Sequence, residues 1–327
     1  MEKRENQVYQ TDLTGKKIAV VGAGGVGGFL AGMLGRVCPH LTLAARGARK
    51  EAILGNGLVL HSEYKGEITV HPETVTEISG MTEQDYIFVC VKNYSLEDVC
   101  REMDHAVTED TVIIPVMNGV DPGDRIRSLI SRGTVVDSLI YIVSFANEDY
   151  SVTQQGDFAD LRIGITDAGA SEKAKIGEVS AILRAADIDH QVSDEIEVEI
   201  WRKYILNCAY NVATAYYDNT IGELRRDPRK AAEYEALVNE AWQVALAKGV
   251  AVTQEHVDAI IHRFYKELAG NATSSLQRDI RAGRTAETET FSGYIVHEGK
   301  KLGLDLPVSS KMYDGLKKAG KERTENE

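Results

Sequence analysis

The fold is decided by the stretch KIAVVGAGGVGGFLAGML, residues 17–34. Its first five residues form a short apolar run rich in β-branched side chains, which is typical of a buried parallel strand. Glycines follow at once, at positions 22, 24 and 27, and the apolar residues beyond them continue as a helix. The stretch therefore predicts a strand, a tight turn and a helix.

Each glycine of this fingerprint has a physical role. Gly22 permits the turn, Gly24 lets the backbone approach a pyrophosphate, and Gly27 allows the helix to pack closely on the strand. The N-terminus of the helix then faces the phosphates. Because residues 41–45 supply a second apolar strand, the context predicts a dinucleotide-binding unit.

The residue after the second strand indicates which dinucleotide binds. An acidic residue there would hydrogen-bond the ribose 2′-hydroxyl of NAD, but this chain has Arg46, with Arg49 and Lys50 close behind. A guanidinium can hold a 2′-phosphate through two hydrogen bonds. We predict NADP as the cofactor, the alternative being that Arg46 is a solvated loop residue.

Composition limits the remaining possibilities. A chain of 327 residues favours two domains, and a formal net charge of −13 argues against nucleic acid or an anionic membrane as the partner. The N-terminal residues 1–14 are polar and no apolar run reaches membrane-spanning length, so a cytoplasmic location is predicted. Four cysteines without paired or metal-binding spacing predict reduced thiols and no metal site: Cys38, Cys90, Cys100 and Cys208.

Two later strands of the predicted sheet also end in polar residues, Lys92 and Asn118. Ligands of open parallel sheets bind outside the carboxyl ends of the strands, so we expect Gly22, Arg46, Lys92 and Asn118 to meet in one crevice and contact the cofactor. Lys92 could instead be a snorkelling surface lysine, and Asn118 part of an ordinary turn.

The middle of the chain is predicted to complete the sheet. Residues 134–145 and 158–165 are strand-like, with a loop at 154–157, and no strand is expected beyond Glu195. The predicted fold class is α/β, with an N-terminal Rossmann-type doubly wound sheet in residues 1–194 and an all-helical domain for substrate and catalysis in residues 195–327.

The helical half carries a polar stripe on an otherwise apolar helix. Residues 204–217 contain no charged residue, and Lys203, Asn207 and Asn211 follow one another at intervals of four, which places them on one face. Buried amides must find hydrogen-bond partners, so the stripe indicates a polar ligand. Alternatively, the asparagines clamp neighbouring helices while Lys203 snorkels.

A second polar concentration lies further along the chain. Ser274 and Ser275 could be helix caps, and Gly283 predicts the end of a helix. We expect Thr285 to cap the next helix, which would place Glu287 and Glu289 in its first turn. For Glu289, the helix dipole is the better explanation of its position.

Together these residues resemble the ketopantoate reductase family, the NADP-dependent 2-dehydropantoate 2-reductases, over residues 16–307. The matching stretches are the fingerprint, Ala45-Arg46-Gly47, Val91-Lys92, Asn118-Gly119, Trp201-Arg202-Lys203 with Asn207 and Asn211, and Ser274-Ser275 with Asp279, Arg281 and Glu287.

The resemblance implies reduction of 2-dehydropantoate to pantoate in pantothenate biosynthesis, and a possible homodimer. It makes Lys203 the general acid and Glu287 a residue that contacts substrate and orders the site. It implies that the remaining polar residues hold substrate: Asn118, Asn207, Asn211 and Ser275. A reductase of another 2-oxo acid, or a non-catalytic NADP-binding sensor, is the alternative function.

The chain departs from the family pattern in three places. Met117 stands where a glutamine is common, Asp137-Ser138 lies near a usual Gly-Gly, and residues 286–289 replace the usual Thr-Glu-Ile-Asp. We expect these changes to reshape the substrate pocket.

Overall fold

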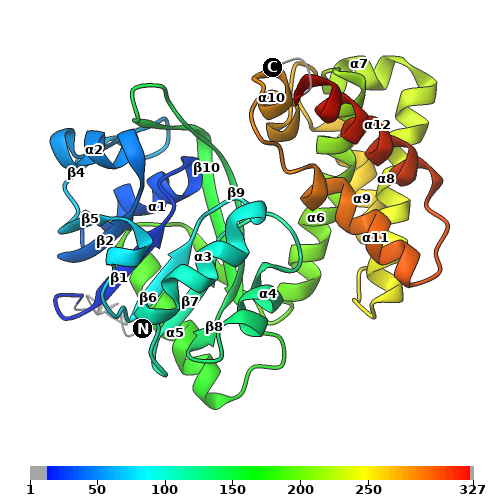
Figure 1. Ribbon diagram of the computed structural model, residues 1–327. Helices are drawn as coiled ribbons and strands as arrows, with labels where there is room; N and C mark the ends of the chain where they lie inside the picture. The colour runs from blue at the N-terminus through cyan, green and yellow to red at the C-terminus, as the bar shows by residue number, and fades with distance from the viewer. Residues whose placement is uncertain (1–12, 325–327) are drawn as a thin grey trace, which may run out of the picture. The chain divides into compact units, whose positions relative to one another are not determined.

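The structure, a computed structural model, describes residues 13–324 (Figure 1). It divides into two compact units. The first comprises the described residues up to Met117 together with Asp121–Ile196, and the second comprises Asn118–Val120 and the described residues from Glu197 onward. The predicted domain limits, 1–194 and 195–327, stay a prediction. Most of the polar N-terminal segment on which the predicted location rests lies outside the described residues.

The first unit contains a six-stranded parallel sheet in the order β5-β2-β1-β6-β7-β8. Its strands are β1 (Lys17–Val21), β2 (His40–Ala44), β5 (Thr74–Thr76), β6 (Tyr86–Val89), β7 (Val112–Pro115) and β8 (Thr134–Val135). In β1, Ile18 and Val20 enter one apolar cluster and Ala19 and Val21 another, because successive side chains point to opposite faces. The predicted Rossmann-type doubly wound sheet is confirmed.

Helices cover both faces of this sheet. They are α1 (Gly25–Leu34), α2 (Gly47–Asn56), α3 (Leu96–Met103), α4 (Pro122–Leu129) and α5 (Ala170–Ala185), with short 3₁₀ turns η1 (Ile78–Gly80), η2 (Asn93–Ser95) and η3 (Asp104–Ala106). Phe29 of α1 and Ile176 of α5 belong to the cluster on one face, and Leu96 of α3 and Ile126 of α4 to the other.

A second sheet, which the sequence did not predict, shares the first unit. It has five strands: β3 (Leu58–Ser62), β4 (Gly66–Val70), β9 (Asp137–Ala146), β10 (Val152–Gly164) and β11 (His190–Val192). The expectation that residues 134–165 complete the first sheet is therefore wrong except for β8. The loop expected at 154–157 is also wrong, because these residues lie within β10, whose pairing with β9 is irregular between Gln155 and Asp160. Such an irregularity tolerates a glycine such as Gly156, which has a φ of +81°.

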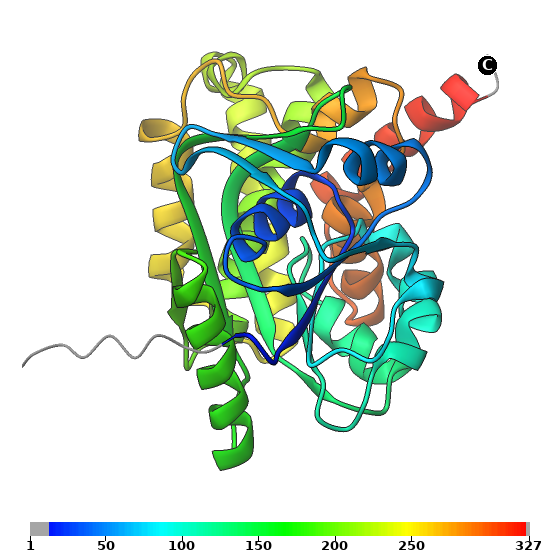
Figure 2. The same ribbon diagram turned by 90° about the vertical axis from the view of Figure 1, so that its left-hand side faces the viewer.

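Helix α1 packs against strands of both sheets (Figure 2). The face that it turns to the second sheet consists of Gly25, Gly28, Gly32 and Gly35. A Cβ on Gly25 would lie 2.4 Å from the carbonyl oxygen of Ser144 in β9, and one on Gly28 would lie 2.4 Å from Val152 in β10. The extra glycines of the opening stretch thus let the second sheet approach the helix closely.

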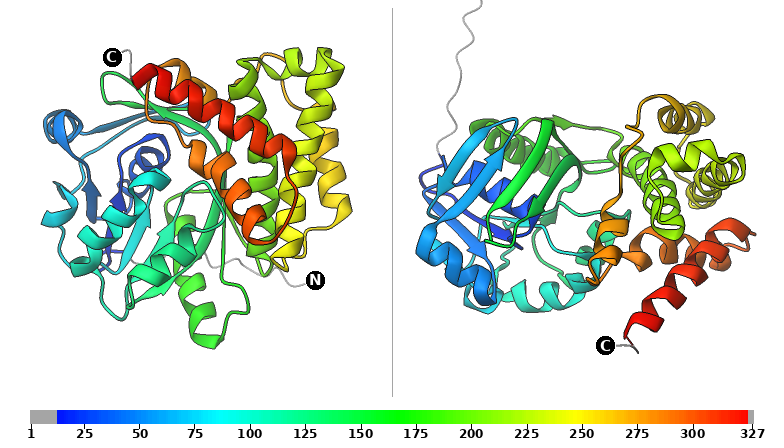
Figure 3. Two further views of the ribbon diagram at one scale, coloured as in Figure 1. Left: turned by 45° about the vertical axis from the view of Figure 1, so that its right-hand side comes forward. Right: turned by 90° about the horizontal axis from the view of Figure 1, so that it is seen from above.

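The second unit is helical, as predicted. It contains α6 (Ile196–Tyr217), α7 (Ile221–Arg226), α8 (Pro228–Ala247), α9 (Gln254–Lys266), α10 (Ser275–Arg281), the π turn η4 (Glu289–Gly293), α11 (Tyr294–Lys301) and α12 (Pro307–Thr324). Apolar residues of α6, α8, α9, α11 and α12 form one core. Helix α12, red in Figure 3, lies beside the orange α11. From Tyr204 to Tyr217 no residue of α6 is exposed, which explains the absence of charge there.

Candidate active site

A pocket of about 540 Å³ lies at the carboxyl ends of the strands of the first sheet. Gly22, Arg46 and Lys92 all line it, so three of the four strand-end residues meet as predicted. Its wall also carries apolar side chains, among them Ile78 and Val91, and three carboxylates: Glu77, Asp98 and Glu102. A volume of this size suits a small-molecule ligand.

The glycine fingerprint fits a dinucleotide through its backbone. Gly22 has a φ of +101°, and a Cβ there would lie 2.7 Å from the Cys90 carbonyl oxygen. A Cβ on Gly27 would lie 1.8 Å from the Gly22 carbonyl oxygen, so α1 can approach β1 only with glycine at this position. At Gly24, by contrast, a Cβ would meet no atom within 4 Å. Gly24 leaves open space where a pyrophosphate would approach the backbone.

Arg46 is exposed and directly precedes α2, and no acidic residue lies in the first turn of this helix. The helix N-terminus and the guanidinium therefore both attract an anion at this edge of the pocket. Arg49 also lines the pocket, but its Nη1 donates to the Tyr150 carbonyl oxygen at 3.3 Å and its guanidinium lies over the Tyr150 ring. Arg46 is thus the arginine better placed to bind a phosphate.

Lys203 lies on α6 and is half-buried. Its Nζ donates to Oδ1 of Asn118 at 3.4 Å, and both residues belong to the second unit. Burial lowers the pKa of Lys203 to about 8, and attraction by the Glu287 carboxylate opposes this shift. The amino group can therefore gain or lose a proton close to neutral pH.

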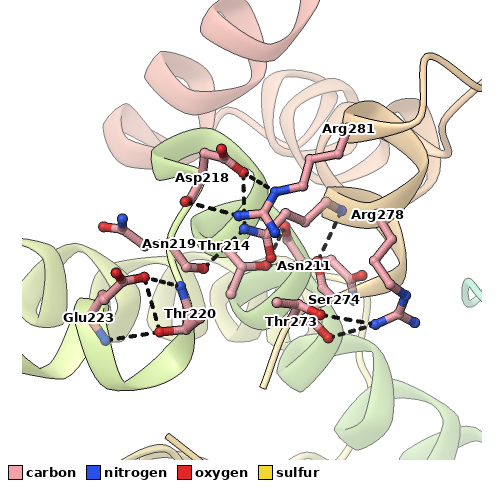
Figure 4. A network of polar contacts seen from close by, with 11 residues as sticks. Asn211, Thr214, Asp218, Asn219, Thr220, Glu223, Thr273, Ser274, Arg278 and Arg281 are labelled. Atoms are coloured by element: carbon pink, nitrogen blue, oxygen red, sulfur yellow. Dashed lines mark hydrogen bonds and ion pairs between the residues drawn. The ribbon is translucent and has the colours of Figure 1, made fainter. Parts of the chain in front are cut away.

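Asn211 is 4% exposed, and its polar atoms form hydrogen bonds with other residues of the chain (Figure 4). Its Oδ1 accepts from Ser275 Oγ at 3.2 Å and from the Leu276 N–H at 3.3 Å, so it clamps the start of α10 to α6. This is the role that the alternative interpretation gave to the asparagines. Asn207, one turn earlier, is half-buried on the same face of α6.

The two adjacent serines differ. Ser274 caps α10, since its Oγ accepts from the Gln277 N–H at 3.1 Å, and Thr214 Oγ1 donates to it at 2.7 Å (Figure 4). Ser275 is the first residue of α10 and its hydroxyl is half-buried beside Asn211. The cap interpretation therefore applies to Ser274.

Glu287 is 5% exposed and precedes the next helix instead of lying in its first turn. The predicted cap at Thr285 is wrong, because helical structure begins at Thr288 and the Phe291 N–H bonds to the Glu287 carbonyl oxygen at 3.1 Å. The predicted helix end near Gly283 is confirmed. Helix α10 ends at Arg281, and Gly283 follows with a φ of +65°. No pattern in the sequence predicted the π turn that follows.

The remaining observations concern the cysteine thiols, metal-ligating groups and membrane-spanning helices. All four cysteines are free thiols, and burial raises the pKa of Cys38 to about 12 and that of Cys100 to about 11, so these thiols are inert. Within residues 13–324, no group of three or more metal-ligating side chains is found. In the same part of the chain, no helix has the length and apolarity that crossing a membrane requires.

Family models match both parts of the chain. The model described as "Ketopantoate reductase PanE/ApbA" matches residues 18–168, and that described as "Ketopantoate reductase PanE/ApbA C terminal" matches residues 195–320. Together with the glycine fingerprint that lines the pocket of the first unit, these matches place the chain among the NAD(P)-dependent oxidoreductases. The chain belongs to the ketopantoate reductase family.

Curated relatives and solved structures agree with this assignment. An uncharacterized oxidoreductase, YkpB of Bacillus subtilis, is 27% identical, covering 92% of this chain and 97% of its own length. A 2-dehydropantoate 2-reductase of Pyrococcus horikoshii is 26% identical, covering 90% and 94%. The structure of a family member from Ralstonia eutropha has a TM-score of 0.85 at 26% identity, covering 94% and 99%. D-mandelate dehydrogenase with NADH and anilino(oxo)acetate shares the fold, with a TM-score of 0.83 at 21% identity, covering 94% and 99%.

Proposed function

We propose that this protein catalyses the NADPH-dependent reduction of 2-dehydropantoate to pantoate, a step of pantothenate biosynthesis. The observation that carries the proposal is Lys203, an amino group with a pKa of about 8 beside the Asn118 amide and attracted by Glu287. A carbonyl reduction needs a group that is protonated near neutral pH and can release its proton to the product oxygen.

The residues that would hold NADPH are Gly22, Gly24 and Gly27 for the pyrophosphate, Arg46 for the 2′-phosphate, and Lys92 at the pocket wall. Asn118 completes the proposed cofactor contacts from its position beside Lys203. The chemistry that NADPH supplies when bound is a hydride for the carbonyl carbon of the substrate.

Lys203 then has two tasks. Its ammonium attracts the carboxylate of a 2-oxo acid and stabilises the negative charge that grows on the carbonyl oxygen. It then donates its proton to that oxygen, which yields the 2-hydroxy acid. Glu287 keeps Lys203 protonated by its charge and contacts a substrate hydroxyl.

The amides and the hydroxyl orient the substrate. Asn207 and Ser275 are half-buried. The Asn207 amide can donate to a carboxylate or hydroxyl oxygen, whereas the Ser275 hydroxyl, whose proton goes to Asn211, can accept from a substrate hydroxyl. Asn211 already binds Ser275 and the start of α10, so we assign it the task of fixing Ser275 for substrate. Holding the substrate in this way reduces the entropic cost of the reaction.

A second candidate is the reduction of another 2-oxo acid on the same scaffold. Two departures from the family pattern favour it: Met117 in place of the common glutamine, directly before Asn118, and residues 286–289 around Glu287. A non-catalytic sensor is less favoured, because a sensor needs the phosphate site but has no use for a buried lysine with a lowered pKa.

The test is NADPH oxidation, followed by the loss of reduced-nicotinamide absorbance, with 2-dehydropantoate beside a panel of other 2-oxo acids. We expect the highest kcat/KM with 2-dehydropantoate. Faster turnover of another acid would replace the named substrate and keep the chemistry. NADPH binding without turnover of any 2-oxo acid would favour the sensor.

The homodimer and the cytoplasmic location are also proposals. The first rests on the family resemblance and is tested by light scattering of the purified protein. The second is tested by cell fractionation.

A further inference from the structure

The helix after Glu287 begins with a π turn, η4, in which the Tyr294 N–H donates to the Glu289 carbonyl oxygen, five residues earlier. A π turn accommodates one residue more than an α turn, is rare, and is found frequently at functional sites. It is placed directly after a buried carboxylate that acts on Lys203. The position of Glu287 therefore depends on how this turn is held.

A tyrosine of α6 holds the turn. The Tyr204 hydroxyl donates to the Thr290 carbonyl oxygen, inside η4, at 2.5 Å. Tyr204 is 2% exposed and is the residue next to Lys203. One short hydrogen bond thus joins the neighbour of the proposed acid to the turn that follows Glu287.

The ring of Tyr204 is itself fixed by two aromatic neighbours. Its centroid lies 5.7 Å from that of Trp201 and 5.8 Å from that of Tyr294, and both pairs are edge-to-face. Trp201 is also on α6, and Tyr294 follows η4 directly. Because edge-to-face rings resist rotation, the hydroxyl has little freedom to leave the Thr290 carbonyl.

We propose that Tyr204 is a positioning residue for this reaction: through its hydrogen bond to Thr290 it fixes the π turn and thereby holds the Glu287 carboxylate where it acts on Lys203. The inference rests on the proposed function, in which Lys203 is the general acid. It requires no contact between Tyr204 and substrate or cofactor.

The electrostatic surroundings of Lys203 make the inference measurable. Among the groups that act on its amino group are the Asn118 amide, from the turn at 118–120, whose Oδ1 accepts a hydrogen bond from it, and the Glu287 carboxylate, which attracts it. Asn118 is uncharged, so Glu287 supplies the attraction that favours the ammonium form. If Glu287 moves away, Lys203 loses its proton at a lower pH.

The first test compares Tyr204→Phe with Tyr234→Phe. Both remove one buried hydroxyl from the helical unit and keep the ring, but the Tyr234 hydroxyl has no hydrogen-bond partner among the described residues. We expect Tyr204→Phe to lower kcat about tenfold or more and to leave the Kd of NADPH unchanged, while Tyr234→Phe behaves as the wild type. Thermal unfolding of each variant shows whether it is folded.

The second test measures Lys203 directly, without substrate or cofactor. In protein labelled with ¹³C at the lysine Cε, the Lys203 signal is assigned by its loss in Lys203→Met. We expect Tyr204→Phe to move its titration midpoint to lower pH, as Glu287→Gln does, by about one unit at most, while Tyr234→Phe does not move it. In the Glu287→Gln background, Tyr204→Phe is expected to add no further shift.

Equal midpoints in the wild type and in folded Tyr204→Phe would overturn the inference, as would an additive shift in the double variant. If Tyr204→Phe does not fold, Glu287→Gln still tests the premise, because an unmoved Lys203 midpoint in that variant would overturn the inference. A wild-type enzyme without turnover would contradict the proposed function instead, and the titration would still decide the role of Tyr204.

Discussion

The candidate sites of the two units differ in which part of the chain forms them: backbone in the first unit and side chains in the second. In the first unit the pocket is shaped by backbone, with Gly22 and Gly24 in its lining after β1 and Gly27 in the first turn of α1, where the helix packs on that strand. In the second unit the reactive groups are side chains from segments far apart in sequence, and Lys203 is the one that Asn118 and Glu287 both influence. A backbone site is sensitive to an added methyl group, whereas a side-chain site is sensitive to the loss of a charge. Substitutions can therefore separate binding of the dinucleotide from chemistry.

The largest expected effect comes from removing the charge in the second unit. Lys203→Met keeps much of the side-chain volume but removes the proton donor, so we expect kcat to fall by about a thousandfold, with the Kd of NADPH changed by less than about twofold. Steady-state kinetics and NADPH fluorescence titration measure the two quantities. Lys248→Met, which removes a lysine paired with Glu298, is the control.

The same residue sets the pH dependence. Burial lowers the pKa of Lys203 to about 8, and a general acid works only when protonated. We therefore expect the wild-type kcat to be level below pH 8 and to fall about tenfold per pH unit above it. A level profile through pH 9.5 would show that another group donates the proton.

The next largest effect concerns the phosphate contact in the first unit. Arg46→Asp replaces a cation by an anion where the 2′-phosphate is proposed to bind, so we expect the preference for NADPH over NADH, measured as the ratio of kcat/KM values, to fall about a hundredfold. Arg36→Asp makes the same charge change at an exposed position away from the pocket and should leave the ratio unaltered. An unaltered ratio in Arg46→Asp itself would contradict the phosphate assignment.

A matched pair of glycine variants tests whether the pocket depends on backbone. Gly24→Ala adds a methyl group where no atom lies within 4 Å, so we expect normal thermal unfolding but about tenfold weaker NADPH binding. Gly27→Ala places its Cβ 1.8 Å from the Gly22 carbonyl oxygen, so we expect a loss of about 3 kcal/mol in unfolding free energy. Equal thermal unfolding of the two variants would contradict the proposed packing.

The same contrast explains what could be predicted from the sequence. The strand, turn and helix at residues 17–34 are local, and Gly22 and Gly27 answer steric requirements within them, so the Rossmann-type sheet was predictable. The second sheet was not, because β3, β4, β9, β10 and β11 come from distant segments and no local pattern specifies which of them pair. The available signal for the second sheet was the set of glycines at positions 25, 28, 32 and 35. A role had been assigned only to the fingerprint glycines, Gly22, Gly24 and Gly27.

For the helical site, the sequence allowed the candidate residues to be predicted, but not the contacts between them. The absence of charge from Tyr204 to Tyr217 located the buried helix, and the interval of four located its polar face. Sequence spacing could not show that Asn211 is engaged by Ser275 and the start of α10, since that contact joins residues 64 positions apart. Nor does any local pattern specify the π turn η4, whose Thr290 carbonyl oxygen accepts a hydrogen bond from Tyr204, 86 positions away.

The smallest effects come from the adjacent serines, of which Ser274 is expected to affect stability and Ser275 substrate binding. Ser274→Ala removes the cap of α10 and the acceptor for Thr214, so we expect a loss of about 1–2 kcal/mol in unfolding free energy with an unchanged KM for the oxo acid. Ser275→Ala removes a half-buried hydroxyl proposed to contact substrate, so we expect KM to rise about fivefold with little change in stability. Denaturant unfolding and steady-state kinetics on both variants measure these quantities. The reverse outcome, with stability lost at Ser275 and KM raised at Ser274, would mean that Asn211 serves only to join α6 to α10 and that the substrate is held elsewhere.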